Sequence, residues 1–227
     1  MTITYDSVKP WGRLFAEYVG MFALTESELR DKRILGCGDG PASFNVEATA
    51  QGYRITSVDP IYSLTVAQIE QRIAETWQQI HAQMIRNLDM FVWTAFNNPD
   101  EVKEARLGAM RQFLADLDRG RDEGRYLDAS LPDLPFEDAS FDLALCSNFL
   151  FLYSENLSTD FHIAATAEMC RVAREVRIFP LMGLANQESE HVVPVMEAMT
   201  ARGWIVERVS VDYEFLRGAN QMLRLRR

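Results

Sequence analysis

The sequence predicts an α/β fold: a doubly wound, mostly parallel seven-stranded sheet with a C-terminal antiparallel hairpin and a helical insertion after the second strand. Three observations support this prediction. Short apolar segments alternate with helical patterns, residues 140–152 form an apolar run typical of a strand buried on both faces, and a short link joins the last two strands. The 227 residues suit one domain, residues 1–227.

The periodicity places each element in chain order. An amphipathic helix lies within residues 1–30, where Phe15, Tyr18 and Phe22 recur at helical spacing. Glycines and prolines mark the ends of the later segments. Ser158 or Thr159 suits the N-cap of the helix expected over residues 158–174. The expected strands are 33–37, 53–60, 124–131, 140–152, 175–182, 204–215 and 220–227, and the expected core helices are 42–53, 158–174 and 191–203.

Charge and composition exclude several classes of partner. The formal net charge of −10 disfavours binding to nucleic acid. No run approaches the roughly 18 apolar residues of a membrane helix, and the first residues lack the layout of a signal peptide. Cys37, Cys146 and Cys170 lie far apart without metal-ligand spacing, which indicates buried free thiols. We therefore expect a cytoplasmic protein with no metal, no membrane partner and no nucleic-acid partner.

A glycine-rich turn, "LGCGDG", joins the first strand to its helix, with Gly36, Gly38 and Gly40 at alternate positions. Bare backbone there lets a bulky ligand approach the free helix N-terminus. Asp59 follows Gly40 by 19 residues at the end of the second strand, where a carboxylate can accept hydrogen bonds from a ribose diol. The alternatives are close helix–strand packing for the glycines and a turn role for Asp59 before Pro60.

The glycine pattern of the loop also indicates which class of nucleotide cofactor it binds. Nicotinamide and flavin enzymes show G-x-G-x-x-G, but Pro41 stands where the third glycine belongs. The G-x-G-x-G form instead resembles the first motif of the class I S-adenosylmethionine-dependent methyltransferases. Asp59 resembles their second motif, and Asp128-Ala129 in "LDASLPDLPF" resembles their third. "EMCRVA", with Glu168, Arg171 and Val172, resembles a phrase that ends one of their later helices.

The resemblance implies a Rossmann-like methyltransferase with S-adenosyl-L-methionine as co-substrate. It implies that the loop, including Cys37, binds the cofactor, that Asp59 and Pro60 lie at the ribose, and that Asp128 and Ala129 lie at the adenine. Ser147 and Asn148, just after the fourth strand, fall where the family places groups around the methionine end or the acceptor. The sequence has Ile34 where the family commonly has an acidic residue, so Asp39 or Arg13 would have to replace its contacts.

Methyl transfer needs an in-line nucleophile, and it needs a base only when that nucleophile starts protonated. No base is evident, because His81, His162 and His191 all suit surface or packing roles. Asn148 and Tyr153 are the candidate catalytic residues. Asn148 lies at the carboxyl end of the fourth strand, and Tyr153 offers a polar hydroxyl within the apolar segment that follows. Core packing is the alternative for the apolar members of that wall, which include Phe149 and Phe151.

An insertion separates the second and third strands. Asp128 follows Asp59 by 69 residues, whereas a plain βαβ unit is complete in about 30. The extra chain reads as two helices, the second starting at Asn98 as cap and Pro99 in the first turn. We expect residues 63–120 to form a helical cap beside the ligand crevice, joined by the N-terminal lid helix with Tyr5 and Trp11. Helix–helix packing alone is the alternative for its apolar stripe.

The sequence therefore predicts an S-adenosylmethionine-dependent methyltransferase that acts on a small molecule in a lidded pocket. Two alternatives remain open: an enzyme that consumes S-adenosylmethionine by another route, such as cyclisation releasing methylthioadenosine, or a non-catalytic S-adenosylmethionine-binding protein. A homodimer is compatible with the sequence, which does not identify the methyl acceptor.

Overall fold

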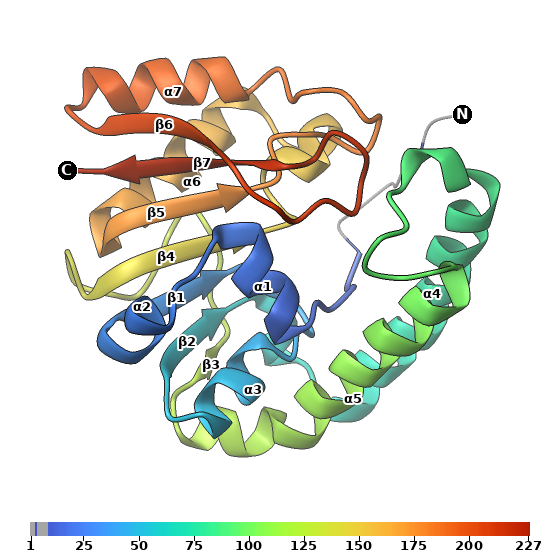
Figure 1. Ribbon diagram of the computed structural model, residues 1–227. Helices are drawn as coiled ribbons and strands as arrows, with labels where there is room; N and C mark the ends of the chain where they lie inside the picture. Colours follow the sequence, from blue (N-terminus) through green and yellow to red (C-terminus); the bar gives the residue numbers. More distant parts are fainter. Residues whose placement is uncertain (1–2, 4–8) are drawn as a thin grey trace.

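A computed structural model describes residue 3 and residues 9–227, and in it seven strands form one sheet (Figure 1). The strands are β1 Arg33–Cys37, β2 Arg54–Val58, β3 Tyr126–Leu127, β4 Phe141–Ser147, β5 Ala173–Phe179, β6 Ile205–Ser210 and β7 Gln221–Arg226. The α-helices are α1 Phe15–Phe22, α2 Glu26–Asp31, α3 Phe44–Ala50, α4 Val66–Arg86, α5 Pro99–Asp122, α6 Thr159–Val172 and α7 Val192–Ala201.

The strand order is β3-β2-β1-β4-β5-β7-β6, and only β7 runs antiparallel to its neighbours. β1 pairs with β2 on one side and with β4 on the other, so the strand order reverses between β1 and β4. In open α/β sheets, ligands bind outside the carboxyl ends of the strands at such a switch point. The predicted fold class, including the C-terminal antiparallel hairpin, is confirmed.

Alternate residues of each strand enter the two layers of the core, as the pleat of a strand requires. Ile34 faces the layer that holds α1 and α3, where Tyr18 and Phe44 stack with ring centroids 4.2 Å apart. Leu35 and Cys37 face the layer of α6 and α7. The three cysteines are buried free thiols, as predicted. Within the described residues, no helix has the length and apolarity needed to cross a bilayer.

The insertion after β2 is helical, as predicted. A 3-10 turn, Pro60–Ser63, leads into α4, which Thr65 caps through its side chain. A second 3-10 turn, Leu88–Met90, precedes α5, where Asn98 is the N-cap and Pro99 stands in the first turn. α4 and α5 lie side by side along the right of Figure 1, beyond the carboxyl ends of the parallel strands.

Several elements differ from the sequence-based expectation. The third strand keeps only two residues, and β6 ends at Ser210 rather than at Phe215. After Val211 the chain leaves the sheet because Phe215 packs into an apolar cluster with Phe91 and Val102 of the insertion. α6 passes directly into β5 without a glycine turn, as expected. The short helix α2 was not predicted.

The N-terminal helix has a different place from the one expected. α1 packs on α3 and on the sheet, and its Tyr18, Met21 and Phe22 are fully buried in that layer. The extended residues that precede α1 lie along the cavity, to which the helix itself contributes Tyr18. Of the expected lid residues, Trp11 is within this segment, whereas Tyr5 lies outside the described residues.

Candidate functional site

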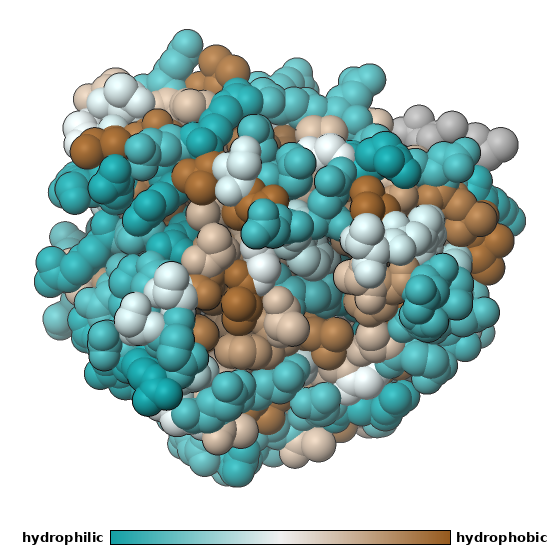
Figure 2. Space-filling model, in the orientation of Figure 1, coloured by the Kyte–Doolittle hydropathy of each residue, from teal (hydrophilic) through white to brown (hydrophobic). Residues whose placement is uncertain are grey.

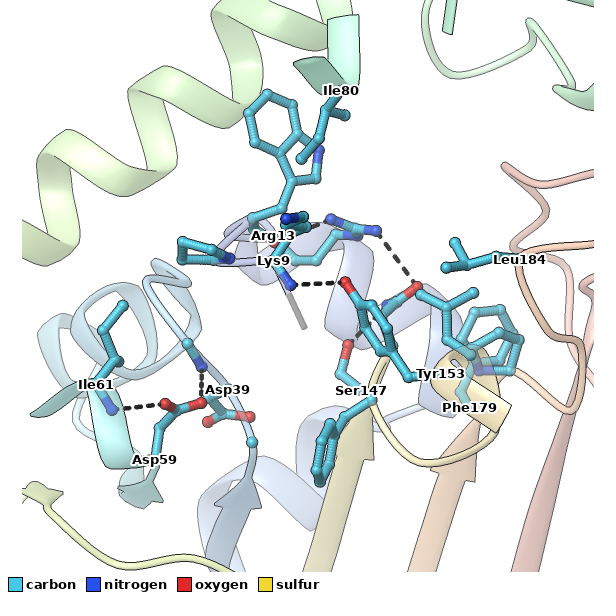
Figure 3. A pocket seen from close by; sticks show the side chains of 18 of the residues that line it. Lys9, Arg13, Asp39, Asp59, Ile61, Ile80, Ser147, Tyr153, Phe179 and Leu184 are labelled. Atoms are coloured by element: carbon cyan, nitrogen blue, oxygen red, sulfur yellow. Dashed lines mark hydrogen bonds between the residues drawn. The ribbon is translucent and has the colours of Figure 1, made fainter. Parts of the chain in front are cut away.

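A cavity of about 500 Å³ lies at the carboxyl ends of the parallel strands, below α4 (Figure 3). Its floor includes the glycine loop after β1 and the residues that follow β2, β4 and β5. Its roof comes from α4, the turn after it, and the loop between β6 and β7. The outer surface in Figure 2 is mainly hydrophilic, with hydrophobic residues in small groups.

Two glycines of the loop after β1 have left-handed backbone conformations. Gly38 has φ +68° and Gly40 has φ +53°, conformations that L side chains rarely adopt. The amide of Gly38 donates to the carbonyl of Val58 at 2.9 Å, which ties the loop to the end of β2. A Cβ atom at Gly38 would lie 2.9 Å from the ring of Phe149. Gly38 and Gly40 both line the cavity, and Phe149 packs where a side chain at Gly38 would stand.

Asp59 connects this loop to the second strand. Its carboxylate accepts from the amide of Gly40 and from the amide of Ile61, each at 2.9 Å. Burial raises the pKa of Asp59, and the nearby charge of Asp128 adds to the effect. Val58 and Leu127 are paired in the sheet, so Asp59 and Asp128 follow neighbouring strands in register. Asp128 is exposed and does not line the cavity, whereas the adjacent Ala129 does.

Asp39 occupies the centre of the loop and is buried. It accepts from the hydroxyl of Tyr18 at 2.8 Å and from that of Ser57 at 2.7 Å. Burial raises the pKa of Asp39 to about 7. A Cβ atom at Gly36 would lie 1.8 Å from an oxygen of Asp39, so the bare backbone of Gly36 makes room for this side chain. Sequence reasoning assigned that glycine to ligand approach, whereas the structure gives it a neighbour within the protein.

The end of β4 supplies a second polar group. Asn148 has φ +52°, and its side chain donates to Ser147 Oγ at 2.9 Å and to the sulfur of Met21 at 3.2 Å. Arg13 reaches the same place, with Nη2 3.4 Å from Asn148 Oδ1 and Nη1 donating to the carbonyl of Trp11 at 3.0 Å. The Nε atom of Arg13 is buried and has no partner in the described structure.

Tyr153 lies farther along the same segment and faces the cavity. Its oxygen accepts from the amide of Lys9 at 3.0 Å, so Lys9 and Tyr153 meet at the cavity (Figure 3). Burial raises the pKa of Tyr153. The phenol therefore stays protonated at neutral pH, which makes it a hydrogen-bond donor and not a base.

The roof contains the residues that the sequence did not reveal. Tyr213, Phe215 and Leu216 line the cavity from the loop after β6, where the sequence predicts a strand as far as Phe215 and a link from Leu216. Phe179, the last residue of β5, and Pro180, which follows it, also line the cavity, and the rule that ligands bind at strand carboxyl ends could have identified them. Tyr213 donates to Glu17 at 2.6 Å, and Glu17 also pairs with Arg106 of α5. These contacts join α1, the roof loop and the insertion.

The motif around Glu168 and Arg171 has a structural role. Glu168 accepts from the amide of Leu134 at 2.9 Å, and Arg171 donates to the carbonyl of Phe136 at 2.8 Å. Together they hold the loop between β3 and β4. Neither residue lines the cavity.

Most of the predicted site residues meet at this cavity. Those that line it are Arg13, Gly38, Gly40, Asp59, Pro60, Ala129, Ser147, Asn148 and Tyr153. Gly36 and Cys37 are buried in the sheet beneath the loop, and Asp128 lies outside the lining. Within the described ranges, no histidine lines the cavity and no cluster suited to a metal ion forms.

The strand order, with β7 reversed between β5 and β6, defines the class I methyltransferase fold that the motifs predicted. The chain is 35% identical over 219 residues to "Uncharacterized protein MJ0045" of Methanocaldococcus jannaschii, covering 95% of each chain. It therefore belongs to the same family as this archaeal protein. No protein-family model matches the chain.

Solved structures with a similar chain path have low sequence identity. Magnesium protoporphyrin IX methyltransferase from Synechocystis, with bound S-adenosylmethionine, is 13% identical with a TM-score of 0.48, over 93% of this chain and 77% of that one. The 1,6-didemethyltoxoflavin-N1-methyltransferase of Burkholderia thailandensis is 14% identical with a TM-score of 0.48, over 92% and 76%.

We expect Gly38→Val to weaken binding of S-adenosylhomocysteine at least tenfold. The new side chain would clash with Phe149, which also lines the cavity, and the shift of either group would distort the loop at the site. Calorimetric titration measures the effect. Gly124→Val is the matched control, because Gly124 has φ +71° but has open space around its Cβ position. Equal affinity in Gly38→Val and wild type would remove the loop from the binding site.

Proposed function

We propose that this protein is an S-adenosylmethionine-dependent methyltransferase that acts on a small molecule inside the closed cavity. The observation that carries the proposal is the junction of Gly38, Gly40 and Asp59 at the switch point of the sheet. Exposed loop backbone can approach a nucleoside, and the adjacent carboxylate can accept hydrogen bonds from a ribose diol.

The described residues give the cofactor an orientation. Its ribose would lie at Asp59 and its adenine beside Ala129, with Asp128 at the edge. Its methionine end would lie between Asp39 and the pair formed by Arg13 and Asn148. The guanidinium of Arg13, which lines the cavity beside Asn148, suits a carboxylate because its N–H groups can donate paired hydrogen bonds to one. Asp39, whose pKa burial raises to about 7, suits an ammonium group that would favour its ionised form.

The sulfonium of the bound cofactor supplies an activated methyl group. The protein's part is to exclude water and to hold the acceptor in line, with the reacting atoms within about 3–3.5 Å. Tyr153 and Asn148 are the polar groups placed to orient the acceptor, and neither serves as a base. Residues 9–14 and the roof loop close the cavity over the reacting centre.

Product analysis tests the reaction type. The protein would be incubated with S-adenosylmethionine, with and without a low-molecular-weight metabolite extract, and nucleoside products separated by mass spectrometry. We expect S-adenosylhomocysteine to accumulate only with the extract. Methylthioadenosine in its place would establish another use of the sulfonium. Binding without either product would make the chain a non-catalytic S-adenosylmethionine-binding protein.

We propose that residues 63–120 form a cap that tightens when the cofactor binds. α4 supplies roof residues such as Ile80 and Met84, so an occupied cavity would restrict the motion of the helix. Hydrogen exchange with and without S-adenosylhomocysteine should show increased protection both in residues 36–42 and in the cap. α7, which lies outside the cavity lining, serves as the internal control. Protection confined to the glycine loop would reduce the insertion to a structural element.

A further inference from the structure

Asp39 places a buried carboxyl group in the wall of the cavity. Its side chain is 7% exposed and lines the cavity from the glycine loop. None of the ion pairs of the described chain includes Asp39, and residues 1–2 and 4–8, outside that part, contain no lysine, arginine or histidine. An ionised group is costly to bury without a partner of opposite charge, so this carboxyl group is suited to a cation that arrives with a ligand.

The position of this carboxyl group is fixed before any ligand arrives. Tyr18 of α1 donates to Oδ1 at 2.8 Å, and Ser57 of β2 donates to Oδ2 at 2.7 Å. The bare backbone of Gly36 packs against the same side chain. Arg13 shares the cavity, but its guanidinium contacts Asn148 and the carbonyl of Trp11. A cation that reaches Asp39 through the cavity would therefore find both carboxyl oxygens already in place.

The groups around Asp39 favour its protonated form in the absence of a cation. Burial raises its pKa to about 7, and the negative charge of Asp59, which Figure 3 shows beside it, adds to the effect. The hydroxyls of Tyr18 and Ser57 act in the opposite direction and offset only part of it. Burial also raises the pKa values of the other nearby titratable groups, which stay neutral at pH 7: Tyr62, Cys37 and Cys146. A substantial fraction of Asp39 is therefore protonated at neutral pH.

We propose that binding of S-adenosylmethionine is coupled to the ionisation of Asp39, which releases a proton to solvent and pairs with the ammonium group of the cofactor. This inference rests on the proposed methyltransferase function. The ammonium group keeps its three protons, and Asp39 changes from a carboxylic acid to a carboxylate. One ion pair forms, and each Asp39 that was protonated loses one proton. Arg13, at a separate place in the cavity, remains available for the cofactor carboxylate.

Calorimetric titration at pH 6, 7 and 8 measures the linked proton. Because the ligand favours the ionised form of Asp39, affinity should rise with pH through the pKa of about 7. We expect S-adenosylhomocysteine to bind about tenfold more tightly at pH 8 than at pH 6. It should release about half a proton at pH 7, read from titrations in buffers with different ionisation enthalpies. Methylthioadenosine, which lacks the ammonium and carboxylate groups, should show less than about a twofold change in affinity and release no proton.

Three variants assign the proton to a residue. Asp39→Asn can still accept from Tyr18 through its oxygen and donate to Ser57 through its nitrogen. It should bind S-adenosylhomocysteine at least tenfold more weakly than wild type at pH 8, and equally at pH 6 and pH 8. Asp59→Asn should bind more weakly but retain the direction of the pH dependence. Asp122→Asn, an exposed position outside the cavity lining, should behave as wild type.

The outcomes separate this inference from the function on which it rests. Failure of S-adenosylhomocysteine to bind wild type at any pH would remove both. Binding that is equally tight at pH 6 and pH 8 would overturn the proton linkage alone. A pH dependence that persists in Asp39→Asn, or that methylthioadenosine shares, would overturn it as well. If Asp39→Asn does not fold, the buffer series on wild type decides: proton release with S-adenosylhomocysteine alone supports the linkage, and release with both ligands or with neither overturns it.

Discussion

Replacing Arg106 by Met should lower the free energy of unfolding by about 3–5 kcal/mol, the cost of breaking a buried ion pair from one side. Arg106 is fully buried, and it pairs with Glu17, which is 6% exposed. Glu17 also accepts from the amide of Leu14 at 3.0 Å and from Tyr213. Without Arg106 its negative charge would remain buried among groups that cannot neutralise it.

Urea denaturation followed by circular dichroism measures this change. Arg111→Met, an exposed position on the same helix, should alter the free energy of unfolding by less than about 0.5 kcal/mol. The double variant Glu17→Gln/Arg106→Met removes both charges. Its amide oxygen can accept from Leu14 and its amide nitrogen can donate to the hydroxyl of Tyr213, so it should recover much of the loss. A double variant no more stable than Arg106→Met would contradict an ion-pair origin.

Asp59→Ala should weaken binding of S-adenosylhomocysteine by about 2–4 kcal/mol, based on roughly 1.5–3 kcal/mol for a hydrogen bond to a charged group. By the usual conversion this is about 30-fold to 1,000-fold in Kd. The loss has two sources. The carboxylate would no longer hold the ribose, and the amides of Gly40 and Ile61 would lose the acceptor that shapes the loop.

Isothermal titration of wild type and three variants separates these sources. Asp59→Asn keeps one carbonyl oxygen and should lose less affinity than Asp59→Ala. Asp122→Ala, at an exposed position at the end of α5, is the control for loss of a surface carboxylate. Unchanged affinity in both Asp59 variants would leave this residue as a turn-forming group only.

The part of the site that the sequence could predict depends on local rules. Gly38 and Gly40 could be assigned to a tight turn because glycine readily adopts the left-handed backbone that both have. The position of Asp59 beside this turn could be predicted because the carboxyl ends of parallel strands lie at the same edge of a sheet. Asn98 and Pro99 begin α5 because a side-chain oxygen and a residue without an amide hydrogen satisfy a helix N-terminus. Each of these features needs only a few consecutive residues.

The remaining features depend on contacts between distant segments. The alternating apolar residues Val209, Val211 and Tyr213 suggested one long strand, but packing of Phe215 on the insertion draws the chain out of the sheet. The spacing of Glu168 and Arg171 gave no sign that they hold the loop at Leu134. Gly36 likewise reads as a ligand-binding glycine until Asp39 is seen above it.

Calorimetric titration of the wild-type protein with S-adenosylhomocysteine, beside Gly38→Val and Gly124→Val, tests the central claim most directly. We predict saturable binding of one ligand per chain to wild type, the same affinity in Gly124→Val, and at least a tenfold loss in Gly38→Val. Absence of binding to wild type, or equal binding to all three proteins, would contradict the assignment of this cavity to S-adenosylmethionine.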